Sequence, residues 1–573
     1  MHAKWLTLEA PRGGRRRMSR PVRWMHQPTN GVPCAVTLGC EIPQREQFSN
    51  RVCDHPRGSL RRWFEQGMKR PSRETHDLGR RLRRLSSRLL GVVVLVVLVG
   101  LGVAWWLYVD ARVDTRSDEP FTSPLRVPPL AEDMSGQDGL VHFSLNIEAG
   151  ESQLFPGEVT ETWGINGPYL GPTLRADIGD TVQIDVRNSI GETTTVHWHG
   201  MHLPAEMDGG PHQEIDPGAT WSPTWTIDQP AATLWYHPHQ MGKTADHVYR
   251  GVAGLFILDD PNGSPTLPTR YGVDDIPLVL QDKRVYPDGA LNMDEGPGNL
   301  VGVLGDRVLV NGTYRPYIDA TTEQVRLRVL NASNARVYNL GFDDDRRFWT
   351  IASDSGLLET PVEAQRRQIS PGERVEIVFA IAPEETTRLQ SFPPDLGMGF
   401  PLDRFNGGDD YLDILEVRGA ETLEPMAPPP RRLTTLDLPE ERESSNTRSF
   451  DLEGFSRING KEMDIGRVDA TVTRNTTEIW ELHNAANTYH NFHVHDVHFR
   501  VLDIDGAEPP VHLQGWKDTL FLPPGTSARI ISRFEDYSDP TSPFMFHCHI
   551  LTHEDSGMMG QFVVVEPDRA GNG

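Results

Sequence analysis

The chain has 573 residues, 52 of them glycine and 45 proline, and a formal net charge of −24 at pH 7. This length allows several domains of about 100–200 residues, and abundant turn residues with little helical periodicity favour an all-β class. Residues 1–88 carry 20 Lys and Arg against seven Asp and Glu, a charge of +13, so the remainder carries −37. The two parts are expected in different surroundings, and the acidic remainder disfavours nucleic acid as a partner because like charges repel.

Residues 1–88 are predicted to be a basic, disordered tail that faces the cytoplasm and its anionic lipid headgroups. One alternative is that residues 1–85 are an over-extended start of the coding region, and another is a zinc site. Cys34, Cys40 and Cys53, with His55 nearby, could provide its ligands, although their spacing matches no standard zinc pattern.

Residues 89–109, LLGVVVLVVLVGLGVAWWLYV, form an apolar run without a charge. A helix needs about 20 apolar residues to cross the hydrocarbon core of a membrane, so this run predicts a transmembrane anchor. Arginines precede it, and Trp105, Trp106 and Tyr108 close it. The basic side stays in the cytoplasm, so the rest of the chain is expected outside, at the cell surface or in the periplasm. The alternative is a secretion signal, cleaved near Ala111, that would release the protein.

After a linker at residues 110–139, short runs of alternating apolar residues predict β-strands. Two breaks, Pro261 to Pro268 and a linker at residues 421–446, divide this part into blocks of a size that suits β-sandwich domains. The expected domains are residues 140–262, 273–420 and 447–567. Tight turns are predicted at Asn311-Gly312 and Asn459-Gly460. The clearest strand patterns are TVQIDVRN, GLFILDD, VRLRVLN, RVEIVFAI, FRVLDI and GQFVVVE.

The sequence contains four His-x-His pairs: His197-Trp-His199, His237-Pro-His239, His493-Val-His495 and His547-Cys-His549. Chance placement of 21 histidines would give about one such pair. Residues i and i+2 of a strand point to the same face, so each pair can present two imidazoles to one point. Because two pairs lie in the first block and two in the third, we predict a site of eight imidazoles between these blocks. Imidazole alone does not select among Zn, Cu, Fe and Ni.

Cys548 lies between His547 and His549 and is the only cysteine after Cys53. On a strand its side chain would point away from the two histidines, toward a second site, and it has no disulfide partner in this part of the chain. Two His and one Cys with a weak axial Met form the blue-copper arrangement. The ligands available for such a site are His490, Cys548, His553 and Met558.

The motifs HWHG, WYHPH, HNFHVH and HCHILTHEDSGMM resemble, in order and spacing, those of the three-domain multicopper oxidases. The resemblance extends from about residue 140 to 567. Stretches such as EMDGGPHQEIDPG, HPHQMGKT and GWKDT are similar to the bacterial copper-efflux (cuprous) oxidases and laccase-like enzymes. The resemblance implies three cupredoxin-like Greek-key β-sandwiches, with a mononuclear copper in the third and a trinuclear cluster between the first and the third.

Four coppers per chain are implied, with ligands carried over motif by motif. The type 1 copper would be held by His490, Cys548, His553 and Met558. The type 2 copper would be held by His197 and His493. The type 3 pair would be held by His199, His237, His239, His495, His547 and His549.

The implied reaction couples four one-electron oxidations of a small reductant at the type 1 site to the four-electron reduction of O2 to water. Electrons would pass through Cys548 to its two neighbouring histidines. Protons are also needed, and Asp208 and Glu554 match the positions that serve proton delivery in copper-efflux oxidases. We therefore expect an enzyme in which Asp208 and Glu554 are catalytic residues. A copper-free binding or scaffold relative is the remote alternative.

Several positions depart from the pattern of the copper-efflux oxidases. The segment before the third domain holds one methionine, Met426, instead of a methionine-rich insertion, and Ala486 and Thr488 stand where acid and methionine residues are usual. Because thioether sulfur selects Cu(I), their absence weakens a role in copper tolerance as a Cu(I) or Fe(II) oxidase. Laccase-like oxidation of phenols or aromatic amines becomes its equal. Asn491 and Asp496 replace a usual Pro and Gly, with a consequence that the sequence does not predict.

Overall fold

The computed structural model describes residues 73–263 and 266–567. Predictions for residues 1–72, including a zinc site at Cys34, Cys40, Cys53 and His55, lie outside these residues. The chain divides into two compact units, Met1–Leu89 and Leu90–Gly573. All the sheets, and both candidate metal sites, belong to the second unit.

The apolar run near the N-terminus lies in one helix, α1 (Arg73–Asp110). Within α1, the stretch Arg80–Asp110 is long and apolar enough to cross a membrane. Its leucines are exposed, Leu95 by 61% and Leu98 by 60%. Such surface is unfavourable in water. Length, composition and exposure therefore agree with the predicted anchor, which stays a prediction.

The first sandwich consists of β2 (Leu140–Ser152), β3 (Thr160–Ile165), β4 (Leu174–Asp177), β5 (Thr181–Asn188), β6 (His197–His199), β7 (Thr220–Trp221), β8 (Thr224–Thr226), β9 (Thr233–His237) and β10 (Gly254–Asp259), with the helical turns η1 (Ala205–Met207) and α2 (Thr244–Arg250). Its sheets have the orders β3-β2-β5-β7, with β8 beside β5, and β4-β10-β9-β6. Pairing of β6 with β9 sets His197 opposite His237. Trp198 belongs to the apolar core, so the histidines on either side of it point away from that core.

The middle sandwich consists of β11 (Asp275–Lys283), β12 (Arg307–Val310), β13 (Thr313–Tyr314), β14 (Pro316–Thr322), β15 (Gln324–Asn331), β16 (Tyr338–Phe342), β17 (Phe348–Ser353), β18 (Gly356–Ala364), β19 (Arg367–Ile369), β20 (Arg374–Ala380), β21 (Thr386–Phe392) and β22 (Leu412–Glu424), with α3 (Leu402–Phe405) and β1 (Ser123–Pro124). Its sheets have the orders β1-β14-β22-β21-β16-β19 and β13-β12-β11-β15-β20-β17-β18. Residues 110–139, expected as a linker, thus contribute an edge strand to this sandwich. Asn311 and Gly312 have φ values of 50° and 72°, as the predicted turn requires.

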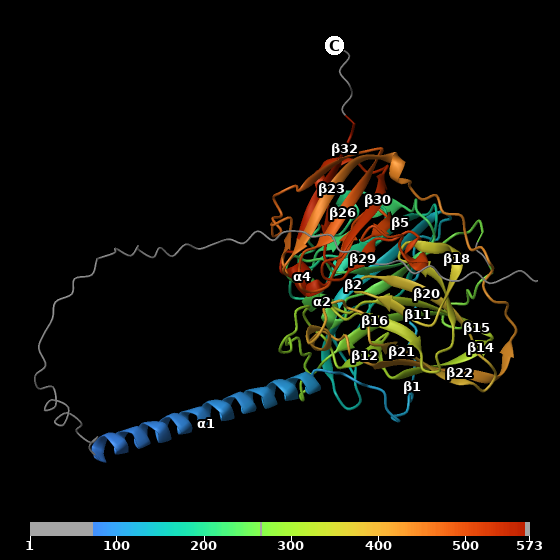
Figure 1. Cartoon of the computed structure of the whole chain (residues 1–573). Coiled ribbons are helices and arrows are strands. Elements are labelled where there is room, and N and C mark those ends of the chain that lie inside the picture. Colours follow the sequence, from blue (N-terminus) through green and yellow to red (C-terminus); the bar gives the residue numbers. More distant parts are fainter. Residues whose placement is uncertain (1–72, 264–265, 568–573) are drawn as a thin grey trace, which may run out of the picture. The chain divides into compact units, whose positions relative to one another are not determined.

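The third sandwich consists of β23 (Ser444–Glu453), β24 (Arg457–Ile458), β25 (Ala470–Thr473), β26 (Thr476–Asn484), β27 (His490–Val494), β28 (Phe499–Ile504), β29 (Thr519–Leu522), β30 (Ser527–Phe534), β31 (Asp539–His547) and β32 (Met559–Val565), with η2 (Glu441–Glu443), η3 (Val511–Leu513) and α4 (Leu551–Asp555). Its sheets have the orders β24-β23-β26-β30-β28 and β25-β32-β31-β27-β29. Figure 1 shows these strands in orange and red, with α4 at the lower end of β23. The second predicted turn, Asn459-Gly460, also has positive φ values, 53° and 73°.

The all-β class with three cupredoxin-like sandwiches is confirmed, and each of the six strand patterns is a strand: β5, β10, β15, β20, β28 and β32. One expectation was wrong in detail. β31 ends at His547, β9 at His237 and β27 at Val494, so Cys548, His549, His239 and His495 follow a strand rather than lie in it. Beyond β31, it is a hydrogen bond from the Cys548 amide to the Met558 carbonyl (3.1 Å) that fixes the backbone.

Candidate metal centre

The four His-x-His pairs meet at one place, between the first and the third sandwich. All eight side chains are at most 1% exposed. The rings of His199 and His493 stack with centroids 3.7 Å apart, and those of His197 and His495 with centroids 3.8 Å apart. In each stack one ring comes from the first sandwich and the other from the third. The predicted gathering of imidazoles is therefore present in the fold.

Ring nitrogens with no hydrogen-bond partner among the described residues line this place. They include Nε2 of His197, Nδ1 of His199, Nε2 of His237 and Nε2 of His493. A buried polar atom without a partner is costly. Burial lowers the pKa of His199, His237 and His493 well below its ordinary value, so these rings are neutral and able to act as ligands.

The ring nitrogens of His239, His495 and His547 lie close enough together to share one cation. Nε2 of His547 is 3.2 Å from Nε2 of His239 and 3.2 Å from Nε2 of His495. Burial lowers the pKa of each of these rings, that of His495 to about 4. Their donor atoms lie within 4.8 Å of one another, as do those of His197, His199 and His237. Neutral imidazoles in this arrangement suit a transition metal such as copper.

Three buried acidic residues hold the opposite nitrogens of these rings. The Asp208 carbonyl accepts from Nδ1 of His197 (2.9 Å), and its carboxylate lies 2.7 Å from Nδ1 of His495. The Asp518 carboxylate lies 3.1 Å from Nε2 of His199. Each contact fixes which nitrogen of the ring stays free, and such outer contacts orient metal ligands.

Asp518 and Glu554 complete the pattern that Asp208 begins. The Asp518 carbonyl accepts from Nδ1 of His493 (2.8 Å), and the Glu554 carboxylate lies 3.4 Å from Nδ1 of His239 and 3.3 Å from Nδ1 of His547. Each acidic residue thus contacts one ring of the first sandwich and one of the third. Sequence reasoning singled out Asp208 and Glu554 but missed Asp518. The available signal was its place in the stretch GWKDT.

The three carboxyl groups differ in charge. Burial would raise the pKa of Asp208, but His495 and His197 outweigh it and hold this pKa below its ordinary value. Burial raises the pKa of Glu554 well above its ordinary value. Its two oxygens have no hydrogen-bond partner among the described residues. Burial therefore favours the protonated form of Glu554, whereas the neighbouring imidazoles favour the ionised form of Asp208.

A second site surrounds the sulfur of Cys548, the residue between His547 and His549 of the histidine cluster. Sγ lies 3.4 Å from Nδ1 of His490 and 3.8 Å from Nδ1 of His553, and these two nitrogens are 3.1 Å apart. Cys548 and Met558 are fully buried in one apolar cluster. Burial raises the pKa of Cys548 to about 12 and lowers that of His553 to about 4. The thiol is therefore protonated until a metal displaces its proton, and the donor types match a blue-copper site.

The two departures Asn491 and Asp496 have structural roles. Asn491 donates through Nδ2 to the Pro371 carbonyl (2.7 Å), and its Oδ1 lies 3.6 Å from Sγ of Cys548. Asp496 has a φ of 68°, a left-handed conformation that favours glycine. Its carboxylate lies 2.7 Å from Nδ1 of His202.

Comparison with known proteins agrees with this donor set. Multicopper oxidase family models match residues 146–263 and 428–568. A multicopper oxidase of Staphylococcus haemolyticus is 35% identical over 444 residues, which cover 76% of this chain and 91% of the relative. The chain belongs to the multicopper oxidase family. Membership implies an oxidoreductase that uses copper, O2 and a reductant, and the buried, unpaired nitrogens fit that metal.

Other multicopper oxidase relatives carry different descriptions. A solved laccase-like multicopper oxidase, CueO, from Ochrobactrum sp., with activity toward lignin model compounds, is 37% identical, has a TM-score of 0.70, and is matched over 77% of this chain and 100% of that one. A Campylobacter jejuni enzyme described as a metallo-oxidase is 26% identical with a TM-score of 0.69, over 80% and 98%. The cell division protein FtsP of Edwardsiella tarda is 37% identical over 450 residues, 77% of this chain and 92% of the relative.

Proposed function

We propose that this multicopper oxidase binds four coppers and couples four one-electron oxidations to the reduction of O2 to two waters. The observation that carries the proposal is the burial of all twelve candidate donor side chains, with groups of His and Cys donor atoms that lie within 4.8 Å of one another. His490, Cys548, His553 and Met558 would hold the type 1 copper. His197 and His493 would hold the type 2 copper. The type 3 pair would be held by His199, His237, His239, His495, His547 and His549.

Bound copper supplies the one-electron acceptor and the centre at which O2 takes four electrons and four protons. The chain connects the two sites. Cys548 belongs to the type 1 site by its sulfur, and its peptide neighbours His547 and His549 belong to the cluster. Nδ1 of His547 donates to the Cys548 carbonyl (3.2 Å). The sulfur of Cys548 is therefore joined to the cluster in two ways. One is the covalent backbone to His547 and His549, and the other is this hydrogen bond between the ring of His547 and the Cys548 carbonyl.

Glu554 is the proposed proton donor, because burial favours its protonated form and it lies against His239 and His547. Asp208, whose ionised form is favoured, lies between His197 and His495 and is proposed to accept protons in the same delivery. General acids placed in this way typically contribute about 100- to 10,000-fold to a rate.

For the reductant we propose a small aromatic molecule such as a substituted phenol or aromatic amine. The ring of Phe455 lies 5.6 Å from that of His553, and Phe455 is 47% exposed. A half-exposed aromatic ring beside a type 1 ligand provides an apolar surface on which a planar reductant can stack. Cu(I) or Fe(II) is the second candidate, because a relative described as a metallo-oxidase has a very similar fold.

Oxygen uptake by the purified holoprotein distinguishes these reductants. We expect turnover of a substituted phenol that does not depend on added Cu(II). Turnover of Cu(I) or Fe(II) alone, or phenol turnover that requires added Cu(II), would instead assign the protein to the metallo-oxidases. A purified protein that retains no copper after reconstitution would instead support the alternative of a copper-free binding or scaffold protein.

We also propose that α1 anchors the enzyme, with the three sandwiches outside the cytoplasm. The length, apolar composition and exposure of α1 support this, together with the arginines in its first half and the aromatic residues near its end. Membrane fractionation of the full chain with N-terminal sequencing of the mature protein tests it. An intact N-terminus in the membrane fraction supports an anchor, and a start near Ala111 in the soluble fraction supports a cleaved signal.

A further inference from the structure

A turn of the middle sandwich touches both candidate sites although that sandwich offers none of the proposed ligands. The turn, residues 370–374, connects β19 to β20. Its Pro371 carbonyl accepts from Asn491, the residue beside the sulfur of Cys548. At Gly372 a Cβ atom would lie 2.9 Å from the ring of His549. Gly372 also has a φ of 84°, so glycine is required there both by conformation and by space.

The strongest contact of this turn is between Arg374 and Asp518. The guanidinium binds the carboxylate through two parallel hydrogen bonds, Nη1 to Oδ1 (2.8 Å) and Nη2 to Oδ2 (2.5 Å). Its other three donors reach the carbonyls of Thr233 (3.0 Å), Gly372 (3.0 Å) and Asp354 (2.8 Å). All five N–H groups of the arginine are thus satisfied. Both side chains of the pair are at most 1% exposed.

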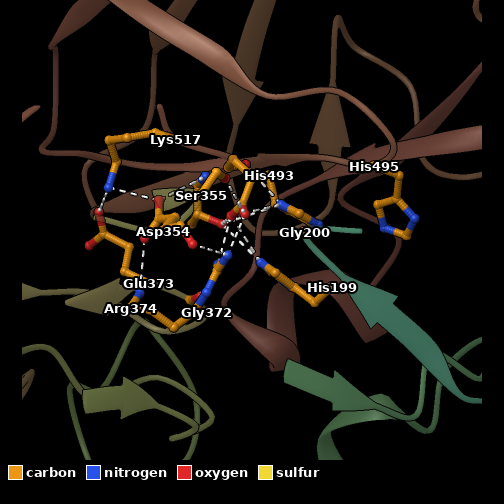
Figure 2. Close-up of polar contacts among 12 residues, drawn as sticks. His199, Gly200, Asp354, Ser355, Gly372, Glu373, Arg374, His493, His495 and Lys517 are labelled. Carbon is orange, nitrogen blue, oxygen red and sulfur yellow. Dashed lines mark hydrogen bonds and ion pairs between the residues drawn. The ribbon is translucent and has the colours of Figure 1, made fainter. Parts of the chain in front are cut away.

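Asp518 passes this constraint to two proposed ligands that come from different sandwiches. Its Oδ1 lies 3.1 Å from Nε2 of His199, and its carbonyl accepts from Nδ1 of His493 (2.8 Å). The other nitrogens of these rings, Nδ1 of His199 and Nε2 of His493, have no hydrogen-bond partner within residues 73–263 and 266–567. Figure 2 shows Arg374 reaching from the turn toward the side of His199 and His493.

Two further ion pairs hold Lys517, the residue just before Asp518. Lys517 is buried, and its Nζ lies 2.8 Å from the carboxylate of Asp354 and 2.8 Å from that of Glu373. Figure 2 shows this group on the far side of Arg374 from His199. Ion pairs from the middle sandwich therefore hold two consecutive residues, Lys517 and Asp518, which directly precede β29 of the third sandwich.

We propose that the turn at residues 370–374 is the positioning element of the trinuclear copper site. Arg374 fixes Asp518 and, through it, the rings of His199 and His493, while Gly372 leaves the space that His549 occupies. The inference rests on the proposed copper assignment. It gives the middle sandwich a role in the chemistry that its lack of ligands would not suggest. Arg374 and Asp518 are positioning residues, since neither contacts a proposed metal position directly.

The test compares Arg374→Lys with Arg328→Lys in the full-length holoprotein. Lysine keeps the charge but cannot form two parallel hydrogen bonds. Arg328 is a matched control, because it is buried, lies on β15 beside β20, and binds Asp275 through two such bonds (2.7 and 3.0 Å). We expect Arg374→Lys to keep the visible type 1 band, to change the hyperfine splitting of the type 2 signal in electron paramagnetic resonance, and to lower kcat about 10- to 100-fold. Arg328→Lys should leave the band, the signal and kcat as they are.

Two further variants keep the inference testable if Arg374→Lys does not fold. Asp518→Asn retains the size of the side chain and should change the same type 2 signal. Gly372→Ala should change the near-ultraviolet absorption of the type 3 pair, because the new methyl group meets the ring of His549. A folded variant whose only change is a lower Tm, with unaltered spectra and kcat, would overturn the positioning role. A wild-type holoprotein without type 1 and type 2 signals would overturn the copper assignment itself.

Discussion

At the scale of single residues, function depends on atoms that the protein leaves unpaired. Nε2 of His197 and Nδ1 of His199 are buried without a partner in the part of the chain that the structure describes, although burial normally demands hydrogen bonds. The opposite nitrogen of each ring is held by Asp208 or Asp518. These contacts orient the two rings and determine which nitrogen of each ring can bind a metal.

Glu554→Gln tests the proton role of a single side chain. Glutamine has nearly the same shape but cannot release a proton, so we expect oxygen reduction to slow about 100-fold or more, while the visible band stays. Rapid-mixing kinetics provide the check. The rate at which the reductant bleaches the band without oxygen should not change and serves as the internal control. If the Glu554→Gln variant holds its full copper content and reduces oxygen at the wild-type rate, the proton role is refuted.

Met558→Leu tests the axial position of the type 1 site. Leucine offers no donor, and the three remaining ligands alone favour Cu(I), so the reduction potential should rise while the visible band stays in place. Met559→Leu is the matched control, since Met559 is equally buried and lies at the start of β32 as a packing residue. A redox titration in which both variants keep the wild-type potential would contradict the assignment of Met558.

The residue scale also shows what the sequence could predict. The His-x-His pairs and Cys548 carry their signal in local spacing, because alternate side chains share a face. Arg374 and Asp518 are 144 residues apart, and no local pattern joins them. Asp496 was recognised as unusual, but its left-handed φ and its contact with His202 required the folded chain.

At the scale of elements, loops that follow strands tie the sandwiches together around the site. His202, which follows β6, lies between the carboxylates of Asp496 (2.7 Å) and Asp536 (3.4 Å), which follow β27 and β30. Tyr537 packs on the same ring, 4.9 Å away, and His498 lies nearby. This contact joins the first sandwich to the third at the edge of the histidine cluster.

His202→Asn should destabilise the protein in a pH-dependent way. Burial alone would lower the pKa of His202, but Asp496 and Asp536 outweigh it and raise this pKa from 6.5 to about 9. A raised pKa means that the stabilisation is fully present below pH 6.5 and is lost as the pH rises through about 9. The loss at pH 6 should be about 1–3 kcal/mol.

Thermal unfolding of wild type and variant between pH 6 and 9.5 measures this difference. The gap in Tm should narrow as the pH rises. His483→Asn is a suitable control, because the ring of His483 contacts an uncharged group, the hydroxyl of Ser527 (3.0 Å). The Tm difference for this variant should therefore not narrow in the same way as the pH rises. A gap for His202→Asn that stays constant with pH would contradict the ion-pair interpretation.

At the scale of the whole molecule, the three sandwiches contribute different parts of the candidate metal sites. The first and third supply the imidazoles, and the third supplies the sulfur site. The middle one holds the turn that contacts both. The sandwich class followed from strand patterns such as those of β5 and β28, which match their predicted residues. The edge strand β1 within the expected linker could not be predicted, because its partner β14 is distant in sequence.

A chain that starts at Ala111 should separate anchoring from catalysis. It lacks α1 but keeps β1 and its pairing with β14. We expect the shortened chain in the soluble fraction, with the same visible band and oxygen uptake as the full chain. The full chain should sediment with membranes. Sedimentation of the shortened chain with membranes would show that another surface carries the attachment.

The most direct test of the central claim is the visible absorption spectrum of the copper-loaded protein and of its Cys548→Ser variant. A thiolate ligated to Cu(II) gives an intense charge-transfer band, which serine cannot provide. We predict that the wild type shows this band together with reductant-dependent oxygen uptake, and that the variant loses both. A copper-loaded wild type without the band would contradict the claim that Cys548 links a copper to the histidine cluster.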